Sequence, residues 1–150
     1  MLKAKDIMTA NVITVKKDLL IKELSEGFVK HRVGGFPVID DSDRLIGVVT
    51  EKDLIEQNKN LHMPTVISLF DAVIYLESNK KFEAEVKKFT GTKVEDIYTP
   101  KVITVNPETL LSEVASIMAN KNVYTLPVME EGKIVGIIGK VDLIKGLAME

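Results

Sequence analysis

The chain has no cysteine and no tryptophan, and only two of its 150 residues are histidine. Without thiols it forms neither disulfides nor zinc–thiolate sites, and it has no cysteine nucleophile. Neither sign of charge dominates, since 20 basic residues face 22 acidic ones and the formal net charge is -2. This balance gives no electrostatic reason to expect nucleic acid or an anionic membrane surface as a partner.

Long apolar runs are absent as well. The longest extend over a few residues, far short of the roughly 20 that cross a bilayer. The first six residues contain no apolar segment typical of a secretory signal. We therefore expect a cytoplasmic protein, complete as it stands because it begins with Met1. A hydrophobic share of 45% with 28% charged residues is typical of a soluble, folded chain.

Motifs of catalysis are also missing. The sequence contains no phosphate-binding P-loop, no dinucleotide-binding glycine motif and no nucleophile elbow. His31 and His62 lie in different segments, without the ligand spacing of a metal site. We expect a protein that is not an enzyme, with no metal site and no required cofactor.

What the sequence does contain is an internal repeat. The stretch from Asp6 to Val15 recurs from Asp96 to Val105, at an offset of 90 residues. Between Asp6 and Val38, 12 of 33 positions are identical to their partners. The offset becomes 89 at Gly47, which matches Gly136, so the second copy has lost one residue in the intervening turn. Self-similarity of this kind predicts two copies of one structural unit.

Each copy has the pattern β-α-β-β-α. β-Branched and apolar runs predict the strands, and apolar residues at intervals of three or four predict the first helix. In the first copy we expect strands at 12–15, 36–39 and 45–49, a helix through Leu20, Leu24 and Phe28, and a helix from Glu51. In the second copy we expect strands at 102–105, 126–129 and 134–138, a helix through Leu110, Val114, Ile117 and Met118, and a helix from Lys140.

The sequence thus predicts an α/β (α+β) fold of two repeats packed sheet to sheet about an approximate two-fold axis. One unit of about 50 residues is only marginally stable alone, so pairing is expected. We place repeat 1 at residues 1–56, a helical connector at 57–93 and repeat 2 at 94–150. The connector has an apolar stretch at 69–76 and a helix from Ser78 to about Thr90. It either covers an open edge of the core or serves as a lid or dimer contact.

Three motifs, each with a partner in the second copy, resemble those of the CBS-domain family, whose members occur as tandem pairs called Bateman modules. They are Asp6-Ile7-Met8-Thr9, Pro37-Val38 and the stretch from Gly47 to Leu54. The resemblance covers the chain apart from the connector. It implies a non-catalytic regulatory module that binds AMP, ADP, ATP or S-adenosylmethionine in clefts between the repeats. It also implies frequent assembly of two pairs into a flat disk, so we expect a homodimer.

The segment Gly47-x-x-Thr50-x-x-Asp53 ends a strand and begins a helix. Unpaired N–H groups at a helix start favour phosphate, and an ionised aspartate suits the diol of a ribose. Gly47 would leave room for a ligand over the strand. The alternative is that Thr50 and Asp53 form only a helix capping box. The family resemblance favours the ligand role, because members use this hydroxyl residue and aspartate for phosphate and ribose.

The second copy departs from this pattern, since Gly139 replaces the hydroxyl residue while Asp142 remains. Phosphate there would be held by backbone N–H groups or by Lys140. We therefore expect two unequal sites, of which the one at Thr50 and Asp53 is the better specified.

An adenine needs an apolar slot and backbone groups that read its edge. The candidates in the first copy are Ile13, Val33, Gly34, Gly35 and Pro37; in the second they are Ile103, Val123, Tyr124, Thr125 and Pro127. The two glycines either expose main-chain amides to a base or cap the preceding helix. Tyr124 either stacks on a base or covers the core.

His31 and Arg32 precede the first of these segments, and Lys121 and Asn122 take their places in the second copy. In the related gamma subunit of AMP-activated protein kinase, basic residues here reach phosphates. His31 and Arg32 otherwise form a solvated helix end, where cations suit the helix dipole. Of the two, Arg32 is the candidate phosphate ligand, because its guanidinium matches phosphate geometry.

The sequence therefore predicts a sensor of an adenine nucleotide that signals to an unidentified partner protein. Two alternatives remain, a sensor of an adenosyl ligand such as S-adenosylmethionine and a dimerisation module without a ligand. The second alternative assigns the dimer contact to Phe70 and Val73 of the connector.

Overall fold

A computed structural model describes residues 1–58 and 92–150. The apolar stretch and the helix predicted for the connector, with Phe70 and Val73, lie outside the described residues. Among the helices of the two described segments, none combines the length and the apolar character that a membrane crossing needs.

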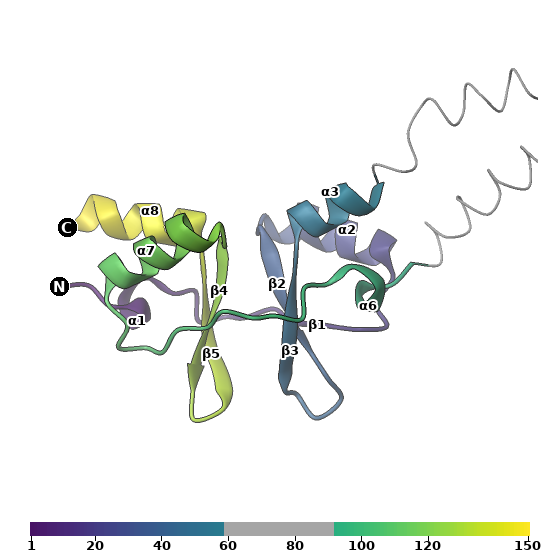
Figure 1. Cartoon of the computed structure of the whole chain (residues 1–150), viewed down its shortest axis with the longest axis horizontal. Coiled ribbons are helices and arrows are strands. Elements are labelled where there is room, and N and C mark those ends of the chain that lie inside the picture. Colours follow the sequence, from purple (N-terminus) through teal and green to yellow (C-terminus); the bar gives the residue numbers. More distant parts are fainter. Residues whose placement is uncertain (59–91) are drawn as a thin grey trace, which may run out of the picture.

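The described residues form two similar halves, each with small helices beside a small sheet (Figure 1). The β-α-β-β-α order predicted for each copy is found in the first copy, whereas in the second copy the first strand is reduced to a single bridge; one short helix precedes the pattern in each copy. The first segment contains α1 (Ala4–Ile7), β1 (Val15–Lys16), α2 (Ile21–His31), β2 (Gly35–Ile39), β3 (Leu45–Thr50) and α3 (Glu51–Asn58). The second contains α6 (Val94–Ile97), α7 (Leu111–Lys121), β4 (Thr125–Glu130), β5 (Lys133–Gly139) and α8 (Lys140–Met149).

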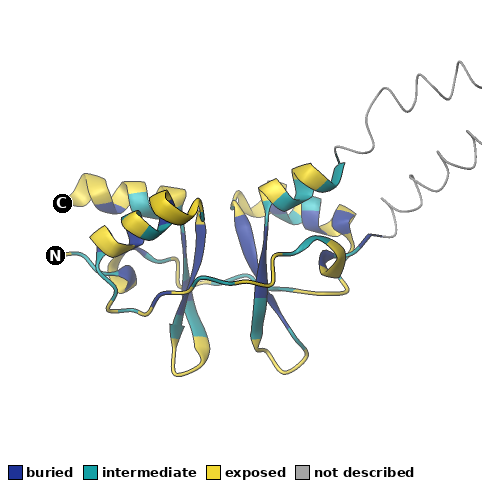
Figure 2. Cartoon of the chain, viewed as in Figure 1, coloured by how far each residue is buried: buried dark blue, intermediate teal, exposed yellow. Residues whose placement is uncertain are grey.

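Two sheets make up the centre of the molecule. One has the order β1-β2-β3, with β1 parallel and β3 antiparallel to β2, and the other pairs β4 with β5 antiparallel. Val38 pairs with Gly47 and Val128 with Gly136, so the change of offset from 90 to 89 falls in the hairpin turn. Most residues of the strands are buried or half-buried, whereas the hairpin tips are exposed (Figure 2). The predicted fold class is confirmed.

The first strand of each copy is shorter than predicted. Of residues 12–15 only Val15 enters β1, and in the second copy only Val105 makes a bridge, to Val128. Thr9 pairs with Ile137 in the second half, whereas Val15 pairs with Val38 in the first. The residues between them therefore cross from one sheet to the other and have no strand beside them, despite their β-branched composition.

The helices α2 and α7 follow the predicted apolar spacing, except that Leu20 and Leu110 lie at the cap before the first helical residue. Ile21, Leu24 and Phe28 are buried on α2, and Leu111, Val114 and Met118 are buried on α7. Both helices end in a left-handed residue, Arg32 or Asn122, with φ of 52° and 53°. The glycines after Arg32 are not in this conformation, so their predicted role as a helix cap is wrong.

The leading segment of each repeat, which contains α1 in the first and α6 in the second, packs into the core of the half that is formed mainly by the other repeat. Ala4 and Ile7 of α1 are buried with Leu111, Val114 and Leu126 of the second half. The main chain joins the same partners, because the Ala4 amide donates to the Thr109 carbonyl at 2.7 Å and the Leu111 amide donates to the Leu2 carbonyl. Nothing in the apolar pattern signalled α1, which has only four residues.

The second leading segment does the same for the first half. Val94 of α6 is fully buried with Ile21, Leu24 and Val49. The bridges between the two repeats occur in equivalent pairs. Lys3 pairs with Leu110 as Lys93 pairs with Leu20, and Thr9 pairs with Ile137 as Thr99 pairs with Val48. This reciprocity supports the approximate two-fold axis between the repeats.

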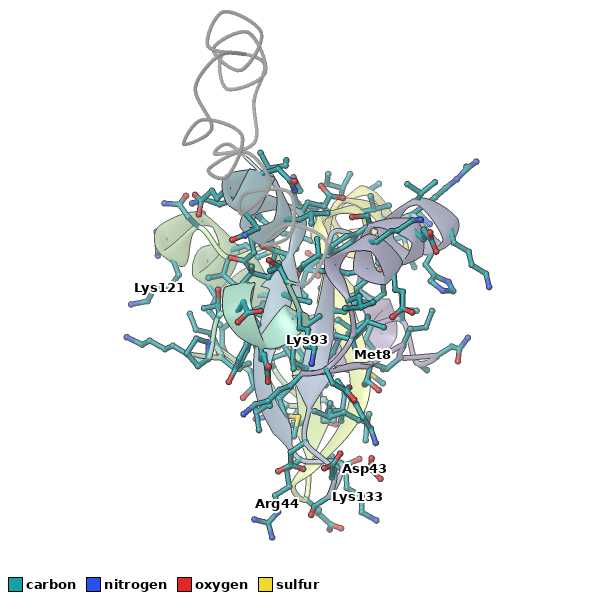
Figure 3. The ribbon with its side chains drawn as sticks, turned by 90° about the vertical axis from the view of Figure 1, so that its right-hand side faces the viewer. Met8, Asp43, Arg44, Lys93, Lys121 and Lys133 are labelled. Atoms are coloured by element: carbon teal, nitrogen blue, oxygen red, sulfur yellow. The ribbon has the colours of Figure 1, made fainter. Side chains whose placement is uncertain are left out.

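Gly47 and Gly136 let the chain segments that pass from one half to the other lie directly against the strands. A Cβ added to Gly47 would lie 2.4 Å from the Tyr98 ring and 2.5 Å from the Thr99 carbonyl oxygen. A Cβ on Gly136 would lie 2.3 Å from the sulfur of Met8, the residue labelled on the crossing segment in Figure 3. The open face predicted over Gly47 for a ligand is therefore filled by the chain itself.

We expect Gly47→Ala to destabilise the fold by about 1–3 kcal/mol, because the new methyl group would displace the backbone at Thr99. Gly34→Ala is the matched control, since the nearest atom to its added Cβ is Glu51 Oε1 at 3.9 Å. It should be neutral or stabilising, by at most about 1 kcal/mol. Urea unfolding measures both variants, and equal midpoints would contradict the account of the crossing.

A small charge cluster ties the N-terminal segment to the turn before α7. The carboxylate of Glu108 accepts from Lys3 Nζ at 2.5 Å and from Lys5 Nζ at 2.8 Å. These two hydrogen bonds, with the positive charges behind them, lower the pKa of Glu108 to about 2. The cluster is exposed, so salt screens its contribution.

Because the pKa of Glu108 is lowered in the folded state, the stabilisation is present above the usual glutamate pKa of about 4.5 and lost as pH falls toward 2. Glu108→Gln should therefore lower the unfolding midpoint at neutral pH and have little effect near pH 2. Glu26→Gln, an exposed glutamate of α2, is the control. A Glu108→Gln effect that does not change with pH would refute the assignment.

Candidate functional site

The junction of β3 and α3 holds Thr50 and Asp53. The Asp53 carboxylate accepts from the Thr50 amide at 3.0 Å and from the Thr50 hydroxyl at 3.2 Å. The Asp53 amide in turn lies 3.3 Å from the Thr50 hydroxyl oxygen. The capping box considered from the sequence is therefore present, and the hydroxyl of Thr50 is engaged within it.

The junction of β5 and α8 repeats this arrangement without the hydroxyl. The Gly139 amide donates to Asp142 Oδ2 at 2.8 Å. Lys140, the first residue of α8, is exposed. Both aspartates are half-buried, and each is the third residue of a helix that follows a strand.

Each of these aspartates also meets a threonine from a crossing segment. The Thr99 hydroxyl lies 3.3 Å from Asp53 Oδ1, and the Thr9 hydroxyl lies 3.2 Å from Asp142 Oδ1. These threonines are not among the site residues that the sequence predicts. The identity of Thr9 and Thr99 at the repeat offset could have indicated a shared role. Their contacts with the aspartates follow only from the way the chain crosses between the two halves.

A carboxylate that accepts from a hydroxyl group can accept equally from a hydroxyl of a ribose diol. Asp53 and Asp142 each have two oxygens, and the neighbouring hydroxyls that they bind are exposed. The chemistry at both junctions is therefore recognition of hydroxyl groups by a fixed carboxylate.

The starts of β2 and β4 meet where the two halves touch. A Cβ on Gly35 would lie 2.3 Å from the Thr125 hydroxyl, and Thr125 is buried. Gly35 is therefore required by this close approach. Gly34, by contrast, is exposed, and its carbonyl accepts from the Glu51 amide at 3.0 Å.

Tyr124 occupies in the second half the position that Gly34 has in the first. Tyr124 is 44% exposed, so part of its surface faces the solvent. The ammonium of Lys140 lies 5.0 Å from the ring centroid, within the range of a cation–π contact. The structure thus brings together two candidate residues that the sequence had assigned to different ends of a ligand.

The remaining apolar candidates lie deeper. Pro37 and Pro127 are buried inside β2 and β4, opposite Val48 and Ile137. Their rings therefore belong to the sheet interior. Each half also contributes two partly buried apolar candidates that pack on its core, namely Ile13 and Val33 in the first and Ile103 and Val123 in the second.

Both basic candidates of the first copy lie at the end of α2. His31 is exposed, with its ring edge-on to Phe36 at 6.3 Å between centroids. Arg32 is also exposed and adopts the left-handed conformation that ends the helix. Within residues 1–58 and 92–150 there is no group of three or more histidine and carboxylate side chains that would hold a metal ion.

Comparison with known protein families identifies both halves. The family model described as "CBS domain" matches residues 4–59 and again residues 94–149. The two matches contain both leading helices and both strand–helix junctions.

Curated relatives are similar over most of the chain. An uncharacterized protein of Methanocaldococcus jannaschii is 29% identical, over 95% of this chain and 89% of the relative. The chloroplastic CBS domain-containing protein CBSX1 of Arabidopsis thaliana is 32% identical, over 87% of this chain. This chain spans only 57% of CBSX1, which is therefore a longer protein.

Among solved structures, the crystal structure of CBSX2 in complex with AMP superimposes with a TM-score of 0.73. It is 26% identical and is covered over 99% of this chain and 98% of the other. CBSX2 is likewise a chloroplastic protein of Arabidopsis thaliana.

Proposed function

The chain belongs to the CBS-domain family, and on that premise we propose that it is a regulatory module that binds an adenine nucleotide and signals to a partner protein. The ligand is AMP, ADP or ATP, bound where the two repeats meet. The module is non-catalytic, in keeping with a family defined by a domain and not by a reaction.

The observation that carries this proposal is the paired placement of Asp53 and Asp142. Each carboxylate lies at the start of a helix, beside a threonine hydroxyl from the other half. Both therefore stand at a seam between the halves, where a ribose diol would replace or join the threonine as donor. The AMP complex of CBSX2, a structure similar over the whole chain, supports adenosine chemistry at such a module.

The resulting site assignment keeps the candidates that remain accessible. Asp53 and Asp142 bind the ribose, while Thr9 and Thr99 orient the two carboxylates. Partly buried apolar residues line the base, and exposed basic residues serve a phosphate. These residues are Ile13, Val33, Ile103 and Val123 for the base, and Arg32 and Lys140 for the phosphate.

A signal requires that the nucleotide bind two conformations of the module with different affinity. The bonds from Thr9 and Thr99 offer such a difference, because a ligand that takes over Asp53 or Asp142 alters the hold on a crossing segment. The partner that reads this change is a separate protein or a further domain. We place its action in the cytoplasm.

We expect AMP to raise the melting temperature of the full chain. At a hundredfold excess over its dissociation constant, a ligand specific for the folded state stabilises it by about 2.7 kcal/mol. Asp53→Ala and Asp142→Ala should each remove part of this shift, because each deletes a ribose acceptor. Differential scanning fluorimetry with AMP, ADP, ATP, adenosine and S-adenosylmethionine measures the effect and ranks the ligands.

Asp96→Ala provides a matched control. Asp96 accepts from the Lys93 amide at 2.8 Å at the start of α6, in the same kind of cap. All three variants should lose about 0.5–2 kcal/mol of stability from the missing cap, but only Asp96→Ala should keep the full AMP shift. A wild-type chain whose melting does not respond to any of these compounds would leave only the ligand-free dimerisation module.

We further propose that two copies associate through an apolar helix face. Val141, Ile144 and Leu147 of α8 are 62%, 62% and 52% exposed at intervals of three residues. Ile55 on α3, the equivalent helix of the first half, is 68% exposed. Exposed apolar side chains on the equivalent helices of both halves are typical of association surfaces.

Ile144→Asp should convert the dimer into a monomer, because it places a charge in the buried part of the interface. Lys145→Asp introduces the same side chain at the adjacent exposed position of α8 and should leave the dimer intact. Sedimentation equilibrium distinguishes the two. A wild-type chain that is monomeric at micromolar concentration, or a dimer that survives Ile144→Asp, would refute this interface.

A further inference from the structure

The two halves differ in charge at one equivalent position. Glu51 is the first residue of α3, and Lys140 is the first residue of α8. Both side chains lie near the residue that precedes the first strand of the hairpin, β2 in the first half and β4 in the second. Glu51 Oε1 lies 3.9 Å from the place of a Cβ on Gly34, and Lys140 Nζ lies 5.0 Å from the ring centroid of Tyr124.

Gly34 and Tyr124 are themselves equivalent in the repeat and flank the contact between Gly35 and Thr125. A carboxylate in the first half and an ammonium group in the second therefore occupy the same place beside the candidate site. The Tyr124 ring holds the ammonium there by a cation–π contact.

Other charges near these positions do not cancel the difference. Lys52 follows Glu51 on α3, but adjacent residues of a helix point in different directions, so its ammonium does not share the place of the carboxylate. Arg32 ends α2 in the first half and Lys121 lies in the last turn of α7 in the second, so each half has a cation at the end of the helix before β2 or β4, and the difference between Glu51 and Lys140 remains. Asp53 and Asp142 are common to both halves.

The Thr50 hydroxyl, for which the sequence predicts a phosphate contact in the first half, does not offset the charge difference between the two sites. The Thr50 hydroxyl donates to Asp53 within the capping box. It is therefore already paired, whereas the Lys140 ammonium is exposed and carries a full charge.

We propose that the two sites take different ligands: the site beside Lys140 takes a nucleotide with a phosphate, and the site beside Glu51 takes an adenosyl compound without one. This inference rests on the proposed function and reverses the order of the sites expected from the sequence. Its physical basis is that a phosphate dianion is attracted by the ammonium and repelled by the carboxylate, while adenosine responds to neither.

Isothermal titration calorimetry of the full chain with AMP and with adenosine tests the proposal. Lys140→Gln should weaken the tighter AMP site by roughly fivefold or more, and Glu51→Gln should strengthen the weaker AMP site by a similar factor. Both variants should leave the affinity for adenosine within about twofold of the wild type, because adenosine carries no charge.

Lys145→Gln is the matched control, because it removes the same charge from an exposed position elsewhere on α8. An equal loss of AMP affinity in Lys145→Gln and Lys140→Gln would overturn the proposal, as would changes of the same size for AMP and adenosine. In these cases ligand binding itself, and with it the proposed function, would stand. A wild-type chain that binds neither ligand would overturn both.

Discussion

The reciprocal exchange of leading segments is the constraint on which the rest of the molecule depends. Ala4 and Ile7 are buried in the second half, and Val94 is buried in the first, so neither half contains all the residues of its own core. The exchange requires that the strands allow a chain to cross at van der Waals distance. Gly47 and Gly136 meet that requirement, because any side chain would overlap the crossing residues Tyr98, Thr99 or Met8.

The same exchange assembles the candidate site. Asp53 and Asp142 belong to strand–helix junctions within one half, but the hydroxyl groups of Thr99 and Thr9 come from the segments that cross. A ligand that binds these carboxylates would therefore act where the two repeats meet. The short helices α1 and α6 end just before Thr9 and Thr99, so they are directly connected to that place. In the proposed sensor, this connection would be the physical route by which occupancy of a site alters the relation of the two halves.

Duplication has not kept the two sites alike. Positions that make the fold agree between copies, as at Pro37 and Pro127 or at Gly47 and Gly136. Exposed positions beside the candidate sites differ, with Gly34 and Glu51 in one half and Tyr124 and Lys140 in the other. Since exposed positions carry little of the packing energy, they are free to diverge while the core stays the same. Two related folds with different charges can then report on two related compounds.

The sequence by itself determined the repeat, the order of helices and strands, and the family, because periodicity and duplication are local signals that survive in the linear chain. The sequence did not predict that α2 and α7 end in the left-handed residues Arg32 and Asn122, because no glycine marks either place. It also did not predict that the first strands are so short. Val12 to Thr14 are β-branched or apolar, but they cross between the sheets and have no strand to pair with. Only the tertiary structure decided the role of Gly35 and Gly47, where a side chain would overlap Thr125 or the crossing chain. Only the tertiary structure likewise placed Thr9 and Thr99 beside the aspartates. The reason is the same in each case: these are contacts between residues about 50 to 130 positions apart, and nothing in the local sequence specifies which distant segment will fill a given space.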